Sequence, residues 1–176
     1  MFLDANILFS ATTPGGFIRD LVRWIITFAE GVTNEYALGE ARKNLGMRQP
    51  GRLQDLELLG KELHIINHTV PPPDVDLRAK DIPILVGAIA AKCTHLLTQD
   101  QRDFGPFFGH TIQSVLITSP NRFLWEIRQS EKEQFEAIQR EAASKLTQKL
   151  KDAAFDEIRA LDAPPLPGDE MPEASL

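Results

Sequence analysis

Apolar and polar stretches alternate along the chain in a way that predicts strands interleaved with helices. Short apolar runs bounded by polar or turn residues predict strands at 1–5, 64–66 and 114–118, and a fourth in the LLTQD segment that ends at Asp100. Between these runs, apolar residues recur at helical spacing in four segments, namely 17–29, the stretch that follows Asn34, 53–63 and DIPILVGAIAA. This alternation implies parallel strands joined by helical crossovers. The predicted fold is therefore α/β, a three-layer α/β/α sandwich with a parallel sheet.

The pattern changes after residue 128. Over 129–162 a long amphipathic helix is predicted, either continuous or broken once, with these apolar residues along one stripe: Phe135, Ile138, Ala142, Leu146, Leu150, Ala153, Ile158 and Leu161. The stripe needs a partner, which can be the domain's own surface, a second copy of the chain or another protein. The segment 163–176 is rich in proline and acid and is expected to be disordered. The predicted organisation is thus a domain at 1–128, a helical extension at 129–162 and a disordered tail.

Composition limits the classes of protein that fit this pattern. With 176 residues, of which 43% are hydrophobic and 25% charged, the chain fits one domain with an appendage. The longest run without a polar side chain, Ile84 to Ala91, is far shorter than the roughly 18 residues of a membrane span. The amino terminus does not resemble a signal peptide, so a soluble, cytoplasmic protein is expected. The net charge of −6 argues against nucleic-acid binding by bulk electrostatics but allows a local basic surface.

Acidic residues stand where a parallel sheet places its functional groups. Asp4 and Asp100 each follow a predicted strand, at the carboxyl end where such sheets bind ligands. Asp81 begins a predicted helix, and Glu40 lies early in another. Four carboxylates from four separated segments are therefore expected to meet at one edge of the sheet.

Carboxylates gathered in this way repel one another and are costly to desolvate, so they require a bound cation or a proton. No matching buried Lys or Arg motif stands beside Asp4 or Asp100. Oxygen ligands without histidine or thiolate suit Mg²⁺ or Mn²⁺. The single cysteine, Cys93, excludes an internal disulfide and a thiolate metal site. The pattern thus predicts a divalent-metal site able to position water and stabilise a phosphoryl transition state.

Four segments carry a family resemblance when their order is considered. They are FLDANILFSA with Asp4, NEYALGEARKNL with Glu40, DIPILVGAIAA with Asp81, and LLTQD with Thr98 and Asp100. Over roughly residues 1–128 the sequence resembles the PIN-domain family, a metal-dependent nuclease fold that includes the VapC-type toxins of toxin-antitoxin pairs. The helical extension departs from the typical family pattern.

The resemblance implies an endoribonuclease that hydrolyses RNA phosphodiesters with a metal-activated water. The implied catalytic residues are Asp4, Glu40, Asp81 and Asp100, and the implied ligands of Mg²⁺ or Mn²⁺ are Asp4, Asp81, Asp100 and Asp103. Asp103 would be a supplementary or outer ligand, and Asn6 and Thr98 would orient their neighbours by hydrogen bonds. An antitoxin or another protein partner is also implied.

The basic and aromatic residues have alternative interpretations. The group Arg42, Lys43, Arg48 and Arg52 directly follows Glu40, so it either contacts RNA phosphates or forms a solvated face. Trp24 and Trp125 are expected to pack in the core rather than to stack on bases.

Two other functional classes compete with the nuclease. One is a non-catalytic PIN-like module for RNA binding or assembly. The other is phosphoryl transfer from a small molecule, as in phosphatases or receiver domains. That class requires a second Asp or a nearby Lys, and the sequence Asp4-Ala5-Asn6 supplies neither.

Overall fold

The computed structural model describes residues 1–161, and along part of the last helix beyond residue 133 it describes the backbone without every side chain. Contacts divide the chain into two units, Met1–Glu126 and Ile127–Leu176. The predicted tail at 163–176 and the apolar side chains predicted along 129–162 lie outside the described part.

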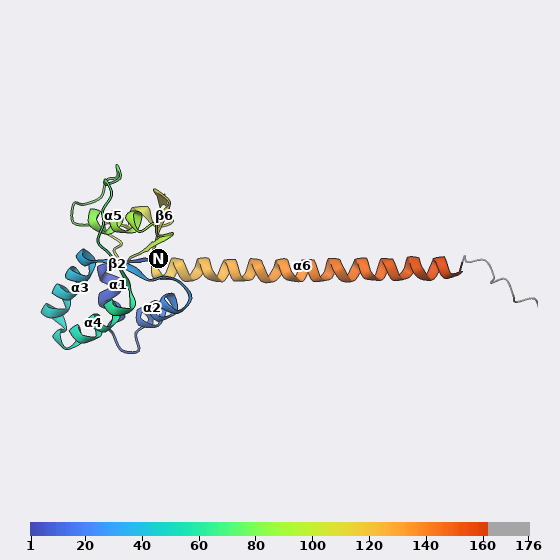
Figure 1. Ribbon diagram of the computed structural model, residues 1–176, viewed down its shortest axis with the longest axis horizontal. Helices are drawn as coiled ribbons and strands as arrows, with labels where there is room; N and C mark the ends of the chain where they lie inside the picture. Colours follow the sequence, from blue (N-terminus) through green and yellow to red (C-terminus); the bar gives the residue numbers. More distant parts are fainter. Residues whose placement is uncertain (162–176) are drawn as a thin grey trace, which may run out of the picture. The chain divides into compact units, whose positions relative to one another are not determined.

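A six-stranded sheet forms the centre of the first unit, with strand order β3-β2-β1-β4-β6-β5 (Figure 1). The strands are β1 Phe2–Leu3, β2 Val32–Asn34, β3 His64–Ile66, β4 His95–Leu97, β5 Thr111–Ile112 and β6 Val115–Thr118. All neighbouring strands pair in parallel except β5, which pairs antiparallel with β6. The predicted α/β fold is confirmed, with one correction: the edge strand β5 makes the sheet mostly rather than wholly parallel.

Helices cover both faces of this sheet. The α-helices are α1 Ala5–Ala11, α2 Phe17–Phe28, α3 Glu35–Arg48, α4 Leu53–Glu62, α5 Ile82–Ala90 and α6 Pro120–Leu161, and the short 3-10 helices are η1 Pro50–Arg52 and η2 Gly105–Phe107. In Figure 1, α5 lies on one side of the sheet and α1 to α4 lie on the other, which gives the three layers. The last helix is continuous from Pro120 onward, so of the two predicted alternatives the unbroken helix is correct.

Two elements at the site were not predicted, α1 and β2. The first strand ends at Leu3 rather than Ala5 because Asp4 caps α1: its Oδ1 accepts a hydrogen bond from the Ala5 backbone N at 2.6 Å. Strand β2 consists of Val32, Thr33 and Asn34, so it lacks the apolar run that predicted the equally short β3 and β4. It is specified by its pairing with β1 on one side and β3 on the other.

A glycine lets α5 lie close to the centre of the sheet. A Cβ atom added at Gly87 would lie 2.6 Å from Asn34 Nδ2 and 2.9 Å from the Phe2 ring. Asn34 itself is fixed, since its Nδ2 donates to the Pro83 carbonyl and its Oδ1 accepts from Ala37 N. The close approach places the beginning of α5, and with it Asp81, at the carboxyl edge of the sheet.

The prediction that both tryptophans pack in the core is wrong. Trp24 is 39% exposed and Trp125 is 59% exposed. Trp24 contacts Phe28 and Phe123 with ring centroids 5.5 and 6.3 Å apart, so it belongs to an aromatic group at the surface. A helix on a sheet buries only one face, and α2 fills that face with aliphatic side chains, namely Ile18, Leu21, Val22 and Ile25.

No helix in residues 1–161 is long and apolar enough to cross a membrane.

Candidate metal centre

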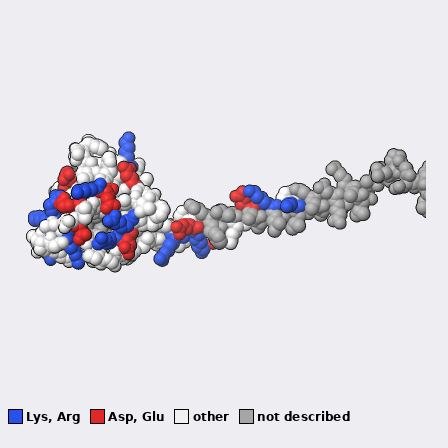
Figure 2. All heavy atoms as spheres, turned by 60° about the horizontal axis from the view of Figure 1, so that its bottom comes forward, with Lys and Arg blue, Asp and Glu red and all other residues white. Residues whose placement is uncertain are grey.

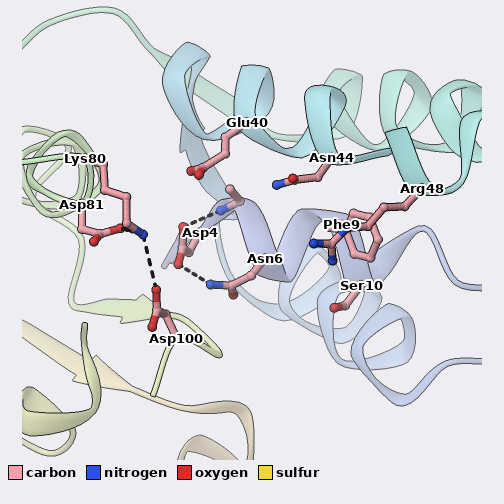
Figure 3. A pocket seen from close by; sticks show the side chains of 11 residues that line it. Asp4, Asn6, Phe9, Ser10, Glu40, Asn44, Arg48, Lys80, Asp81 and Asp100 are labelled. Atoms are coloured by element: carbon pink, nitrogen blue, oxygen red, sulfur yellow. Dashed lines mark hydrogen bonds and ion pairs between the residues drawn. The ribbon is translucent and has the colours of Figure 1, made fainter. Parts of the chain in front are cut away.

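A cavity of about 230 Å³, here called the acid pocket, opens beside the carboxyl ends of β1 and β4. Its lining consists of Asp4, Ala5, Asn6, Phe9, Ser10, Glu40, Asn44, Arg48, Lys80, Asp81 and Asp100. Figure 3 shows the four carboxylates of Asp4, Glu40, Asp81 and Asp100 around one end of the pocket, and Arg48 with Phe9 at the other end. The four acids predicted to be catalytic thus line one cavity although they come from four separated segments.

Asp4 is buried, with 4% of its surface exposed, and is held by hydrogen bonds on both carboxylate oxygens. Besides the bond from Ala5 N to Oδ1, its Oδ2 accepts from Asn6 Nδ2 and from Thr98 Oγ1, each at 2.6 Å. Asn6 Oδ1 in turn accepts from Gln99 N at 2.8 Å, which ties α1 to the segment after β4. Thr98 and Asn6 therefore fix the orientation of the Asp4 carboxylate.

Burial raises the pKa of Asp4 from 3.8 to about 6. The hydrogen bonds from Thr98 and Ala5 oppose this rise, while repulsion from Glu40 and Asp81 adds to it. The Asp4 carboxylate is therefore destabilised in the folded protein as it stands, and a cation in the pocket would relieve this.

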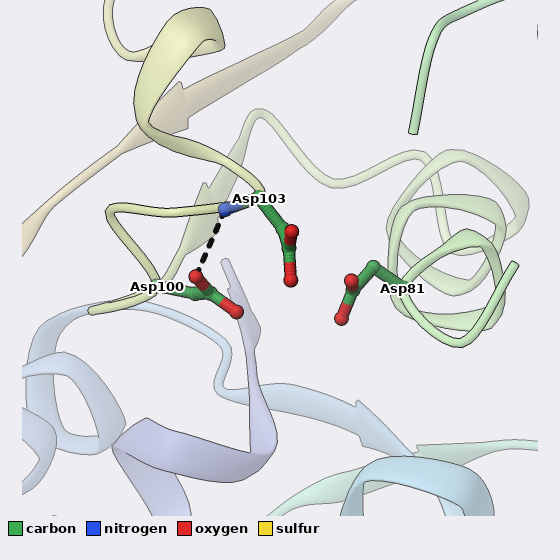
Figure 4. A group of neighbouring side chains, drawn as sticks. All are labelled: Asp81, Asp100 and Asp103. Carbon is green, nitrogen blue, oxygen red and sulfur yellow. Dashed lines mark hydrogen bonds between the residues drawn. The ribbon is translucent and has the colours of Figure 1, made fainter. Parts of the chain in front are cut away.

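Asp81, Asp100 and Asp103 form a second arrangement at the same end of the pocket, here called the aspartate cluster (Figure 4). One oxygen from each lies within 4.8 Å of the others. Asp100 is oriented by its own loop, since its Oδ1 accepts from the backbone N of Arg102 and Asp103, both at 3.0 Å, and its backbone N donates to Thr98 Oγ1. Three carboxylates at this separation can hold a divalent cation.

A half-exposed lysine lies against this cluster, a contact that the sequence pattern did not predict. Lys80 Nζ is 3.1 Å from Asp81 Oδ1, 3.1 Å from Asp103 Oδ2 and 3.9 Å from Asp100 Oδ2. Arg78 Nε contacts the other oxygen of Asp103 at 2.9 Å. The Lys80 side chain is 48% exposed, so it can leave the cluster for solvent without unfolding the site.

One oxygen of the cluster has no partner among the described residues: Asp81 Oδ2 is buried and accepts no hydrogen bond. Burial raises the pKa of Asp81, and the ion pair with Lys80 only partly offsets this. For Asp103, desolvation also acts to raise the pKa, but the hydrogen bond from Lys80 and the positive charges of Arg78 and Lys80 lower it overall. A buried unpartnered carboxylate oxygen within an all-oxygen donor set fits a hard divalent cation. The residues present therefore suit Mg²⁺ or Mn²⁺.

Only one of the four predicted RNA-binding residues lines the acid pocket, and it is Arg48. Arg42 pairs with Glu57 at 2.8 Å on the surface, and Arg52 donates to Thr13 Oγ1 and Gln49 Oε1. Lys43 is exposed. On the face of the first unit in Figure 2, basic and acidic side chains are intermingled.

Five lining residues were not predicted as site residues, namely Ala5, Phe9, Ser10, Asn44 and Lys80. Ala5 lies between the predicted Asp4 and Asn6, and helical spacing identifies three of the others. Asn44 lies one turn beyond Glu40 on α3, and Ser10 lies one turn beyond Asn6 on α1, so each shares the face of a predicted residue. Phe9, three residues after Asn6, follows by the same rule. Lys80 directly precedes Asp81, but which way its side chain turns is decided by the tertiary structure.

A comparison with solved structures finds the same architecture elsewhere. One chain of VapBC2 from Rickettsia felis, solved bound to a DNA fragment from their promoter, superposes on 67% of this chain and 96% of its own length, with a TM-score of 0.50 and 14% sequence identity. The likeness is one of fold. The sequence matches no protein-family model and no curated protein.

Proposed function

We propose that the protein is a divalent-metal-dependent endoribonuclease that hydrolyses RNA phosphodiesters at the acid pocket. One observation carries the proposal: acids from four separated segments converge on one cavity, and one of them, Asp81, has a buried oxygen that no described residue hydrogen-bonds. Lys80 offsets only part of the negative charge of these acids, so the arrangement favours the entry of a divalent cation. The fold shared with a VapBC2 chain and the resemblance to the PIN-domain family support the same chemistry.

In this proposal Asp81, Asp100 and Asp103 hold Mg²⁺ or Mn²⁺, and Asp4 and Glu40 add negative charge across the pocket. The ion, when bound, supplies Lewis-acid activation of water and stabilises the charge of the phosphoryl transition state. Asn6 and Thr98 keep the Asp4 carboxylate aimed at the pocket through the bonds described above. Arg48, at the opposite end in Figure 3, is placed to contact a neighbouring phosphate.

The biological role that fits best is that of the toxin in a toxin-antitoxin pair, restrained by a protein partner. The solved neighbour is a chain of a VapBC2 structure, and the family that the sequence resembles includes VapC-type toxins. The apolar residues of 129–162 remain the predicted surface for such a partner or for a second copy of this chain.

The test is cleavage of a mixture of single-stranded and structured RNA by the full chain with Mg²⁺ or Mn²⁺. Asp100→Asn should lower the cleavage rate at least a hundredfold, because the loss of one charge weakens both cation binding and transition-state stabilisation. EDTA should abolish cleavage. Asp74→Asn, an exposed acid in the connector before α5, is the matched control and should leave the rate unchanged. Cleavage that survives Asp100→Asn or EDTA undiminished would overturn the proposal.

A second candidate is the non-catalytic RNA-binding or assembly module, and the position of Lys80 favours it. The lysine already supplies a positive charge to all three carboxylates of the aspartate cluster. If it serves as a permanent counter-ion, Mg²⁺ and Mn²⁺ should neither bind in calorimetry nor support cleavage. The nuclease proposal requires both.

A further inference from the structure

A second cavity, here called the side pocket, lies outside the carboxyl ends of β2 and β3, next to the acid pocket along the same sheet edge. Asn34 ends β2 and Ile66 ends β3, and both line it. Asp4 and Asp100 follow β1 and β4, which are the next strands in the sheet order. Two strand spacings, roughly 10 Å, thus separate the two pockets along the edge.

Helix α3 also joins the two pockets. Tyr36 lines the side pocket and Glu40 lines the acid pocket, and the two residues are one helical turn apart on the same face. Desolvation raises the pKa of Tyr36, and the negative charges of Glu40, Asp81 and Asp4 raise it further, so the phenol lies within the field of the acids. Pro83, which also lines the side pocket, is two residues after Asp81.

The lining of the side pocket suits a flat, uncharged ring. Tyr36, His68 and Pro83 offer ring faces, and Val86 with Gly87 adds apolar surface from α5. The lining contains no Lys or Arg, and Glu35 contributes a negative charge, so a phosphate is disfavoured there. The carboxylate of Glu35 can accept hydrogen bonds, and the side-chain amide of Asn67 can donate and accept them, so both can bond to the polar edge of a base. The volume, about 260 Å³, is just below the roughly 300 Å³ at which pockets for drug-sized ligands begin.

We infer that the side pocket is a nucleobase subsite, in which Tyr36 stacks on the base of a single-stranded RNA nucleotide adjacent to the phosphate held in the acid pocket. The inference rests on the proposed function, since it places the RNA that this function requires. Tyr36 is 42% exposed and lines the side pocket, so a base in this pocket would contact its side chain. A base held in this way has to be unpaired, so the subsite selects single strands over duplexes. It also makes cleavage depend on which base lies next to the cleaved phosphodiester.

The test asks whether removing the ring of Tyr36 and removing one base of the substrate affect cleavage through the same contact. After the cut is mapped on a single-stranded RNA, the same RNA is made with an abasic site at each neighbouring position in turn. One position should lower kcat/KM of the wild type about tenfold, which is the scale of a lost stacking contact. Tyr36→Ala should lower kcat/KM on intact RNA by a similar factor and remove the penalty at that position. Tyr36→Phe, which keeps the ring, should behave as the wild type. Phe28→Ala, an equally drastic change at an exposed aromatic on α2, is the matched control.

A binding measurement without metal separates this inference from the proposed function. In EDTA, the wild type should bind a short intact RNA about tenfold more tightly than a ribose-phosphate chain of the same length without bases, and Tyr36→Ala should reduce this ratio at least threefold. If the wild type shows this tenfold binding ratio and Tyr36→Ala reduces it, but the wild type cleaves no RNA, the subsite stands and the nuclease proposal fails. If the ratio or the abasic penalty is the same in Tyr36→Ala as in the wild type, the nucleobase subsite is wrong.

Discussion

Lys80 Nζ lies 3.1 Å from Asp103 Oδ2, so a lysine side chain contacts the carboxylate cluster that would hold a divalent ion. The lysine and a metal ion are therefore competitors for the same oxygens. The fold keeps the lysine half-exposed, with a flexible stem that can release it.

Replacing Lys80 by methionine should strengthen divalent-ion binding. Without the lysine, the three carboxylates keep their mutual repulsion until an ion enters, so the affinity for Mn²⁺ should rise about fivefold, or ~1 kcal/mol, as expected for a half-exposed ion pair. Isothermal titration calorimetry with Mn²⁺ measures this. Lys61→Met, at an exposed lysine on α4, serves as the control and should leave the affinity unchanged. Equal or weaker binding by the Lys80 variant would show that the lysine does not compete with the ion.

Stability should depend on pH through Asp4. Its pKa is about 6 in the folded protein against 3.8 as its ordinary value, so between these values the folded state binds the extra proton. Stability is therefore lost as pH rises from about 4 to about 6, by on the order of 3 kcal/mol, and stays lower above pH 6. Asp4→Asn lacks this titration.

The measurement is the free energy of urea unfolding of the wild type and of Asp4→Asn at pH 4.5, 5.5, 6.5 and 7.5 without metal. The wild type should lose stability relative to the Asn variant across this series. A difference between the two proteins that does not change with pH would contradict the raised pKa.

Thr98→Val should destabilise the site by removing a hydroxyl that bonds to three neighbours. Thr98 is fully buried; its Oγ1 donates to Asp4 Oδ2 and accepts from Asn6 Nδ2 and the Asp100 backbone N. The loss should lower the free energy of unfolding by about 1–3 kcal/mol and raise the pKa of Asp4 further, since the hydrogen bond from Thr98 lowers it. Thr98→Ser keeps the hydroxyl and should retain most of the stability. Equal unfolding free energies for the two variants would mean that the hydroxyl contributes little.

Gly87→Ala tests the close packing of α5 on the sheet. The added methyl would meet Asn34 and the buried Phe2 ring at less than 3.0 Å, so the free energy of unfolding should fall by about 1–3 kcal/mol. Gly46→Ala on α3 adds the same methyl where no atom lies within 4 Å, and should stabilise the helix by about 0.5–1 kcal/mol. Thermal unfolding of both variants measures the contrast. Similar melting temperatures for the two would show that α5 can shift without cost.

The sequence by itself determined the order of most elements and the convergence of the acids. Periodic apolar residues predicted α2, α4 and α5, and Asn34 predicted the beginning of α3, because these signals are local and each element needs only its own residues. Asp4 and Asp100 could be placed at one sheet edge because the carboxyl ends of parallel strands face the same way.

Only the tertiary structure decided what surrounds each acid. Strand β2 exists because it pairs on both sides, and the short edge strand β5 because it pairs with β6, so neither carries a pattern of its own. The contact of Lys80 with Asp103 joins side chains 23 positions apart, through a loop whose path no periodicity encodes. Local propensity fixes elements, whereas side-chain direction and cavity shape follow from packing among residues distant in the chain. That is why the acids were predictable from the sequence, while the lysine among them and the side pocket beside them were not.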